Sequence, residues 1–119
     1  MTFGIEGTTA TVVSLALDAA ALRQQAISAN IANVNTPGYR PVRVRFEEHL
    51  KSLDAASLEG VRPTVEADPL AGDGTNGPAV ALDQEVARLS ANTLHYQVLL
   101  RALNRQFSIL GAAINEGKR

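Results

Sequence analysis

Apolar residues in the last third of the chain recur at alternating spacings of three and four. The pattern runs over four heptads without a break. It predicts a helix of about 30 residues with a coiled-coil type seam. Asp83 is the predicted N-cap of this helix, and Gly117 is its predicted stop. The predicted seam consists of Val86, Leu89, Thr93, Tyr96, Leu100, Leu103, Phe107, Leu110 and Ile114.

The first third of the chain repeats the pattern with smaller residues and in two adjacent stripes. Together they form an apolar surface wider than one partner helix covers. We therefore expect packing between molecules to supply the missing cover; a locally folded middle segment is the alternative. The first stripe contains Ile5, Thr8, Val12, Leu15, Ala19, Leu22, Ala26, Ala29 and Asn33. The second contains Val13, Leu17, Ala20, Ile27, Ile31 and Val34.

A proline–glycine turn is predicted to end the first helix. Pro37 disfavours helical geometry at Thr36, and Pro37-Gly38 suits the central positions of a type II turn before Tyr39. The side-chain amides of Asn30 and Asn33 can bond to the turn or to a neighbouring helix.

The segment between the two helices is predicted to be short and mostly irregular. Residues 42–46 alternate strictly between apolar and basic side chains, which predicts a strand. Residues 60–80 are rich in proline and glycine and predict an irregular connection. The expected fold is mainly α, an antiparallel coiled-coil hairpin of long terminal helices. Its expected segments are residues 1–39, 40–82 and 83–119.

Composition narrows the possible functions. The chain has 119 residues, enough for one small domain. Aromatic residues make up 4% and the formal net charge is −1, which argue against a nucleic-acid partner. Cysteine is absent, so thiol catalysis and cysteine-ligated zinc are excluded. No apolar run is long enough to span a membrane. No basic residue precedes Arg23, so we expect no conventional cleaved signal peptide.

The chemical inventory predicts neither an enzyme nor a site for a metal, a cofactor or a small-molecule substrate. His49 and His95 lie in different segments without a metal-ligand spacing. Glu47 and Glu48 are adjacent and point to different faces of any regular element. The segment 72–74, Gly-Asp-Gly, has no following helix or lysine to bind phosphate, so we interpret it as a turn.

Three arginines lie in or beside the predicted strand. Arg40, Arg43 and Arg45 are followed at once by two glutamates, which weakens any nucleic-acid signal. We expect a solvated strand face, or a salt-bridging surface toward a protein neighbour. On that basis Arg43→Ala is expected to have a mild effect.

Residues 28–40, SANIANVNTPGYR, resemble the N-terminal signature of bacterial flagellar rod, hook and related axial proteins. In that signature a helix ends in the pattern A-N-x-A-N-x-x-T-P-G-Y, which this chain matches through Asn30, Asn33, Thr36, Pro37, Gly38 and Tyr39. The segment 82–85 (LDQE), Asn92, Tyr96 and the segment 113–117 resemble the proximal-rod members of the flagellar basal-body rod family. Pro41 and the arginines after it depart from the usual pattern.

The resemblance implies a structural subunit. Its helices would pair within one molecule and pack with neighbours around a hollow rod in the periplasm. The implied partners are further copies, other rod proteins, the rod-to-MS-ring adaptor and the flagellar type III export apparatus. Phe46 and Leu50 look like a short motif for the export gate, although such a pair is equally common as a core anchor. The alternatives are another rod protein of the family, or a cytoplasmic helical-hairpin adaptor with one coiled-coil partner.

Overall fold

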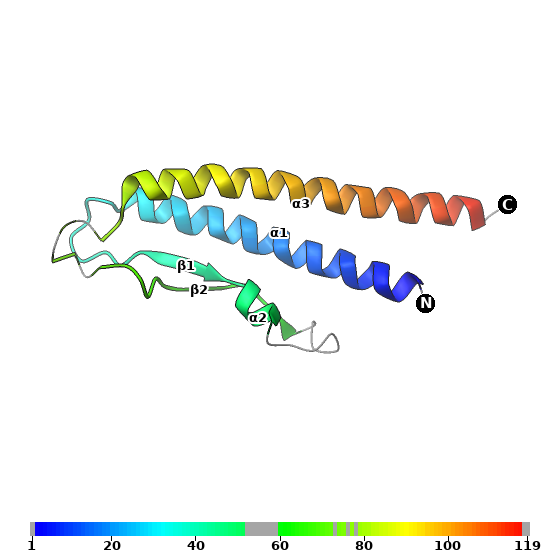
Figure 1. Cartoon of the computed structure of the whole chain (residues 1–119), viewed down its shortest axis with the longest axis horizontal. Helices are drawn as coiled ribbons and strands as arrows, with labels where there is room; N and C mark the ends of the chain where they lie inside the picture. Colours follow the sequence, from blue (N-terminus) through cyan, green and yellow to red (C-terminus); the bar gives the residue numbers. More distant parts are fainter. Residues whose placement is uncertain (1, 52–59, 73, 76, 78, 118–119) are drawn as a thin grey trace.

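Two long helices lie side by side and antiparallel, and a small two-stranded sheet runs along the other side of the first helix (Figure 1). The computed structural model describes residues 2–51, 60–72, 74–75, 77 and 79–117. The mainly α fold with long terminal helices is as predicted. No helix in the described ranges is both long and apolar enough to cross a membrane. The elements are α1 (Thr2–Ala32), β1 (Val42–Arg45), α2 (Glu47–Lys51), β2 (Thr64–Ala67) and α3 (Leu82–Gly117).

Between Leu15 and Ala26, the middle segment covers the first apolar stripe of α1. The strict alternation after the turn directs Val44 and Phe46 to one face, where both are buried. Small side chains on α1 let this segment approach the helix closely. In this range the alternative of a locally folded middle segment holds, and the cover expected from neighbouring molecules is supplied within the chain. The buried cluster consists of Leu15, Ala19, Ala26, Val44, Phe46 and Val61, with Ala16, Leu22, Val42 and Leu50 packed against it.

The second stripe of α1 is also largely covered within the molecule. Ala20 and Ile27 are buried, while Val13, Leu17, Ile31 and Val34 are half-buried. Asn92 of α3 donates a hydrogen bond to the Ala20 carbonyl, so α3 lies against this side of α1. Helix α1 is thus held between α3 on one side and the sheet on the other.

Strand β2 falls in the stretch predicted to be irregular. It pairs antiparallel with β1, with Val42 opposite Ala67 and Arg45 opposite Thr64. Its only large apolar residue, Val65, is 47% exposed, so β2 carries no buried alternation for sequence reasoning to detect. Backbone pairing with β1 defines this strand, and that pairing is non-local in the sequence.

The predicted seam of α3 is divided between two faces. Leu89, Tyr96, Leu103 and Leu110 share the inner line with the buried Glu85 and Asn92. Val86, Leu100, Phe107 and Ile114 are 41–58% exposed and, with exposed Thr93, form a second line that we call the outer line. The inner line is polar at Glu85, Asn92 and Gln106. A search for apolar periodicity omits these positions, and the predicted seam therefore included exposed residues of the outer line.

Helix α3 begins at Leu82, two residues earlier than an N-cap at Asp83 predicts. The Ala81 carbonyl accepts the Glu85 backbone N–H at 3.0 Å, which makes Ala81 the residue preceding the first turn. Asp83 is inside that turn, where its carboxylate accepts the neighbouring Gln84 N–H. The assignment of Asp83 as N-cap is therefore wrong. The last described residue of the helix is Gly117, so the predicted stop there lies at the edge of the described residues.

The turn after α1 has the predicted geometry. The Tyr39 N–H donates to the Thr36 carbonyl at 3.2 Å, and Gly38 has a φ of 77°. A positive φ at the third position, after proline, defines a type II turn. The turn reverses the chain and brings β1 alongside α1.

Gly38→Ala is expected to lower the free energy of unfolding by about 1–2 kcal/mol, because a Cβ disfavours the left-handed backbone region. Nothing lies within 4 Å of an added Cβ at Gly38, so strain alone would account for the loss. Gly111→Ala is the matched control, because Gly111 lies inside α3 with equal space around it. That change should stabilise the protein by about 0.5–1 kcal/mol. Urea unfolding of both variants measures the difference, and equal effects would refute the argument.

Candidate assembly surface

Asn30 joins four parts of the molecule at the turn end of the hairpin. Its side chain is fully buried and uses its whole hydrogen-bonding capacity. The amide nitrogen donates to the Val42 carbonyl at 3.0 Å and to Glu85 Oε2 at 3.3 Å. The amide oxygen accepts the Val42 N–H at 3.0 Å and the Tyr39 hydroxyl at 2.9 Å. Asn30 therefore fixes α1, the turn, β1 and α3 to one another.

Glu85 is the second centre of this network. Its side chain is 1% exposed and pairs with Arg43 and, at 2.8 Å, with Arg88. Arg43 also pairs with Asp68 at 3.1 Å. The expectation of a solvated strand face is wrong for Arg43, and so is the premise that its loss would be mild. Sequence reasoning placed Glu85 only in the helix start and in the family-like segment 82–85. The burial of the Glu85 carboxylate can be recognised only when the face of α3 that packs on α1 is known.

Tyr39 donates into the same network as a neutral phenol. Burial raises the pKa of its hydroxyl, the nearby Glu85 carboxylate raises that pKa further, and Arg43 opposes both effects. The hydroxyl therefore keeps its proton and its hydrogen bond to Asn30 throughout the neutral pH range.

Asn33 and Thr36 close the end of α1. The Asn33 amide donates to the Ala29 carbonyl at 2.8 Å, and its oxygen accepts the Thr36 hydroxyl at 3.0 Å. The Thr36 N–H also donates to the Asn33 carbonyl at 3.0 Å. Pro37 and Gly38 lie exposed at the turn itself. The signature residues thus build one local structure, with Asn30 inside and the turn outside.

Arg23, Arg45 and Arg40 lie outside this network. Arg23 of α1 pairs with Glu47 at 2.9 Å and donates to the Val44 carbonyl. Partial burial acts to raise the pKa of Glu47, but hydrogen bonds from its own backbone and from Arg23, together with the charges of Arg23 and His95, outweigh it and lower that pKa. Arg45 pairs with Glu66 at 3.3 Å across the sheet, with both side chains about half exposed. Arg40 is exposed.

Asn92 lies in the contact between the two long helices. Only 6% of it is exposed, and its amide donates to the Ala20 carbonyl and to Gln24 Oε1, both at 2.9 Å. A buried polar residue of this kind sets the register of two paired helices. Asn92 entered the sequence analysis only through the family resemblance.

The other predicted site residues divide between the core and the surface. On α1, Leu15 and Ile27 are buried, and Val12, Leu22 and Ile31 are half-buried. Phe46 is 2% exposed and Leu50 is half-buried, so this pair anchors the middle segment in the folded chain. The exposed members of the predicted seam are those of the outer line, together with Tyr96. Among the described residues, the large apolar side chains without full cover are concentrated on α3.

Comparison with known proteins gives the family. A family model described as "Flagella basal body rod protein" matches residues 13–40, most of α1 and the turn. The Bacillus subtilis (strain 168) flagellar basal body rod protein FlgB is 30% identical, with 87% of this chain and 90% of that protein covered. The chain belongs to the FlgB family of flagellar basal body rod proteins.

Two further FlgB relatives agree with this assignment. FlgB from Escherichia coli (strain K12) is 30% identical over 86% of this chain and 89% of its own length. FlgB from Borreliella burgdorferi is 25% identical over 82% of this chain and 89% of its own length. The FlgB family is structural and not enzymatic, and this chain is a structural rod protein. The family match at residues 13–40 includes Asn30 and Tyr39 of the buried network, and Asn33 at the end of α1.

Proposed function

We propose that this FlgB-family chain polymerises in the flagellar rod through helix–helix packing, and that neighbouring subunits complete the cover of α3. The observation that carries the proposal is the outer line, whose four apolar side chains are 41–58% exposed in the single chain. Full burial of such a side chain contributes roughly 1.5–3 kcal/mol. Neighbours that cover this line therefore gain a substantial driving force for assembly.

The two ends of the hairpin differ in how much of α3 is buried within the single chain. At the turn end, Asn30, Glu85 and Asn92 are buried and bonded. Beyond Asn92, no residue of α3 up to Gly117 is fully buried. We infer that the turn end folds within the subunit. The opposite end of the hairpin, which contains residues 94–117 of α3 and which we call the open end, depends on contacts with other subunits.

The proposal extends to location and partners. FlgB relatives are named as proteins of the basal body rod, so we place this chain in that rod, in the periplasmic space. Its partners there would be further copies, other rod proteins and the adaptor that joins the rod to the MS ring. Delivery by the flagellar type III export apparatus would use the unfolded chain. Phe46 and Leu50 would be accessible as an export-gate motif at that stage and would become buried only on folding.

Purified basal bodies test the proposed function. The chain carries an epitope tag and replaces the native copy in the bacterium that encodes it. Immunoblots of purified basal bodies and electron microscopy should then place the tag in the rod, with motility retained. A chain that stays in the cytoplasm as a dimer of defined size would contradict the proposal and favour a helical-hairpin adaptor.

A further inference from the structure

We propose that the outer line of α3 docks against the exposed face of α1 in a second copy of this chain. The inference rests on the proposed function and assigns the surfaces of one contact within the assembly. It is carried by a groove over α1, by the spacing of the side chains that would fill it, and by an unpaired charge on each side.

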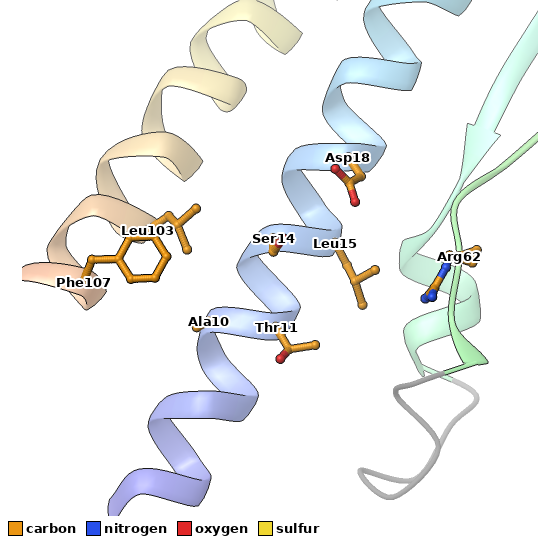
Figure 2. A pocket seen from close by; sticks show the side chains of 8 residues that line it. All are labelled: Ala10, Thr11, Ser14, Leu15, Asp18, Arg62, Leu103 and Phe107. Atoms are coloured by element: carbon orange, nitrogen blue, oxygen red, sulfur yellow. The ribbon is translucent and has the colours of Figure 1, made fainter. Parts of the chain in front are cut away.

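The groove lies over the face of α1 that neither α3 nor the sheet covers. Its floor near the open end is formed by Ala10, Thr11 and Ser14, with Leu103 and Phe107 on one side and Arg62 on the other (Figure 2). This section has a volume of about 770 Å³. A second section of about 570 Å³ lies nearer the turn end, between Ala21 and Gln25 of α1 and Thr93 and Leu100 of α3.

The floor and the outer line have matching repeats. The exposed floor residues follow spacings of three and four, and members of the outer line follow one another every seven residues. Floor side chains are short except at Gln25, whereas the outer line presents leucine, phenylalanine and isoleucine beside Val86 and Thr93. Large side chains on one helix thus meet small ones on the other at the same period, which is the requirement for knobs-into-holes packing. The exposed floor positions are Thr11, Ser14, Asp18, Ala21 and Gln25.

Charge favours this pairing over contact between two outer lines. Asp18 is exposed on the groove floor and has no ion-pair partner in the described part of the chain. Arg101 follows Leu100 on α3 and is likewise exposed without an ion-pair partner among the described residues. When Leu100 of one copy lies on the floor of another, Arg101 comes within reach of Asp18. Two outer lines packed together would instead bring like charges near each other.

Three members of the outer line, Thr93, Leu100 and Phe107, also border the groove of their own copy. A docked helix would therefore contact these side chains together with the floor on α1. Contact between the outer line of one copy and the α1 floor of the next is heterologous, and such contacts extend into open helical assemblies unless the rotation closes a ring.

Two exposed apolar residues provide the first test. Leu100 is 41% exposed on the outer line, and Val98 is 56% exposed on the opposite side of the same helix. Sedimentation velocity of the purified chain at rising concentration should show association of the wild type. Leu100→Glu should raise the apparent dissociation constant at least about tenfold, while Val98→Glu leaves it unchanged. Circular dichroism should show native helicity for both. Equal effects of the two substitutions would overturn the assignment.

Charge reversal tests whether the groove over α1 holds the outer line of a second copy. Asp18→Arg and Arg101→Asp should each weaken association, and the double variant should restore it to near the wild-type constant. If Leu100→Glu abolishes association but Asp18→Arg does not change it, the outer lines pair with each other and the groove assignment is wrong. A wild-type chain that stays monomeric at every concentration would also overturn this inference. Rod incorporation of the tagged chain would still support the proposed function in either case.

Discussion

Glu85→Ala is expected to lower the free energy of unfolding by about 3 kcal/mol, the range typical of breaking a buried ion pair. Glu85 is 1% exposed and bonds to Arg43, Arg88 and Asn30. Its removal leaves Arg43, which is only 25% exposed, without its partner on α3. The change also cuts the link between α3 and the turn. Urea unfolding, followed by circular dichroism, measures the loss.

Glu66→Ala is the matched control for this prediction. It removes a carboxylate from another arginine pair, but both Arg45 and Glu66 are 44–48% exposed. Exposed pairs contribute less than about 1 kcal/mol because water screens them and the side chains lose entropy on pairing. Equal, small losses for the two variants would show that the buried network does not hold the turn end together.

Leu103→Asp is expected to abolish incorporation into the rod. Leu103 is half-buried on the inner line of α3 and borders the groove over α1. An aspartate there places a charge where α1, α3 and any docked helix converge, and an unpaired charge is strongly disfavoured in such a contact. A cost of several kcal/mol corresponds to a reduction of more than about 100-fold, since each 1.4 kcal/mol is tenfold.

Quantitative immunoblots of purified basal bodies measure this loss, together with motility in soft agar. Ser108→Asp is the control, because Ser108 is exposed on α3 and the same charge is introduced there. That variant should be incorporated as the wild type is. Normal motility of Leu103→Asp would contradict the role given to the inner line.

Sequence periodicity was sufficient for the helices and the turn. A long 3,4 repeat requires a helix whatever its partner, and proline followed by glycine restricts the backbone locally. These are local properties of the chain, so α1, α3 and the type II turn at Gly38 could be predicted. The resemblance to flagellar axial proteins added the family, and the comparisons confirmed it.

The faces of α3 could not be predicted because its inner line contains polar residues. Glu85 is buried because Arg43 and Asn30 come from elsewhere to pair with it. The Asn92 amide nitrogen likewise depends on Gln24, while Asn92 Oδ1 has no hydrogen-bond partner among the described residues. Apolar periodicity assigns such positions to solvent and shifts the seam toward the outer line. The same dependence on distant partners explains the missed strand β2 and the misjudged Arg43.

Hydrogen–deuterium exchange of residues 94–117 tests the central claim most directly. In the isolated chain, amides in this part of α3 should exchange much faster than those of residues 85–92, which the buried network holds. In purified rods the same amides should become protected, because neighbouring subunits cover the outer line. Equal protection of residues 94–117 in the isolated chain and in the rod would contradict the claim that assembly completes this helix.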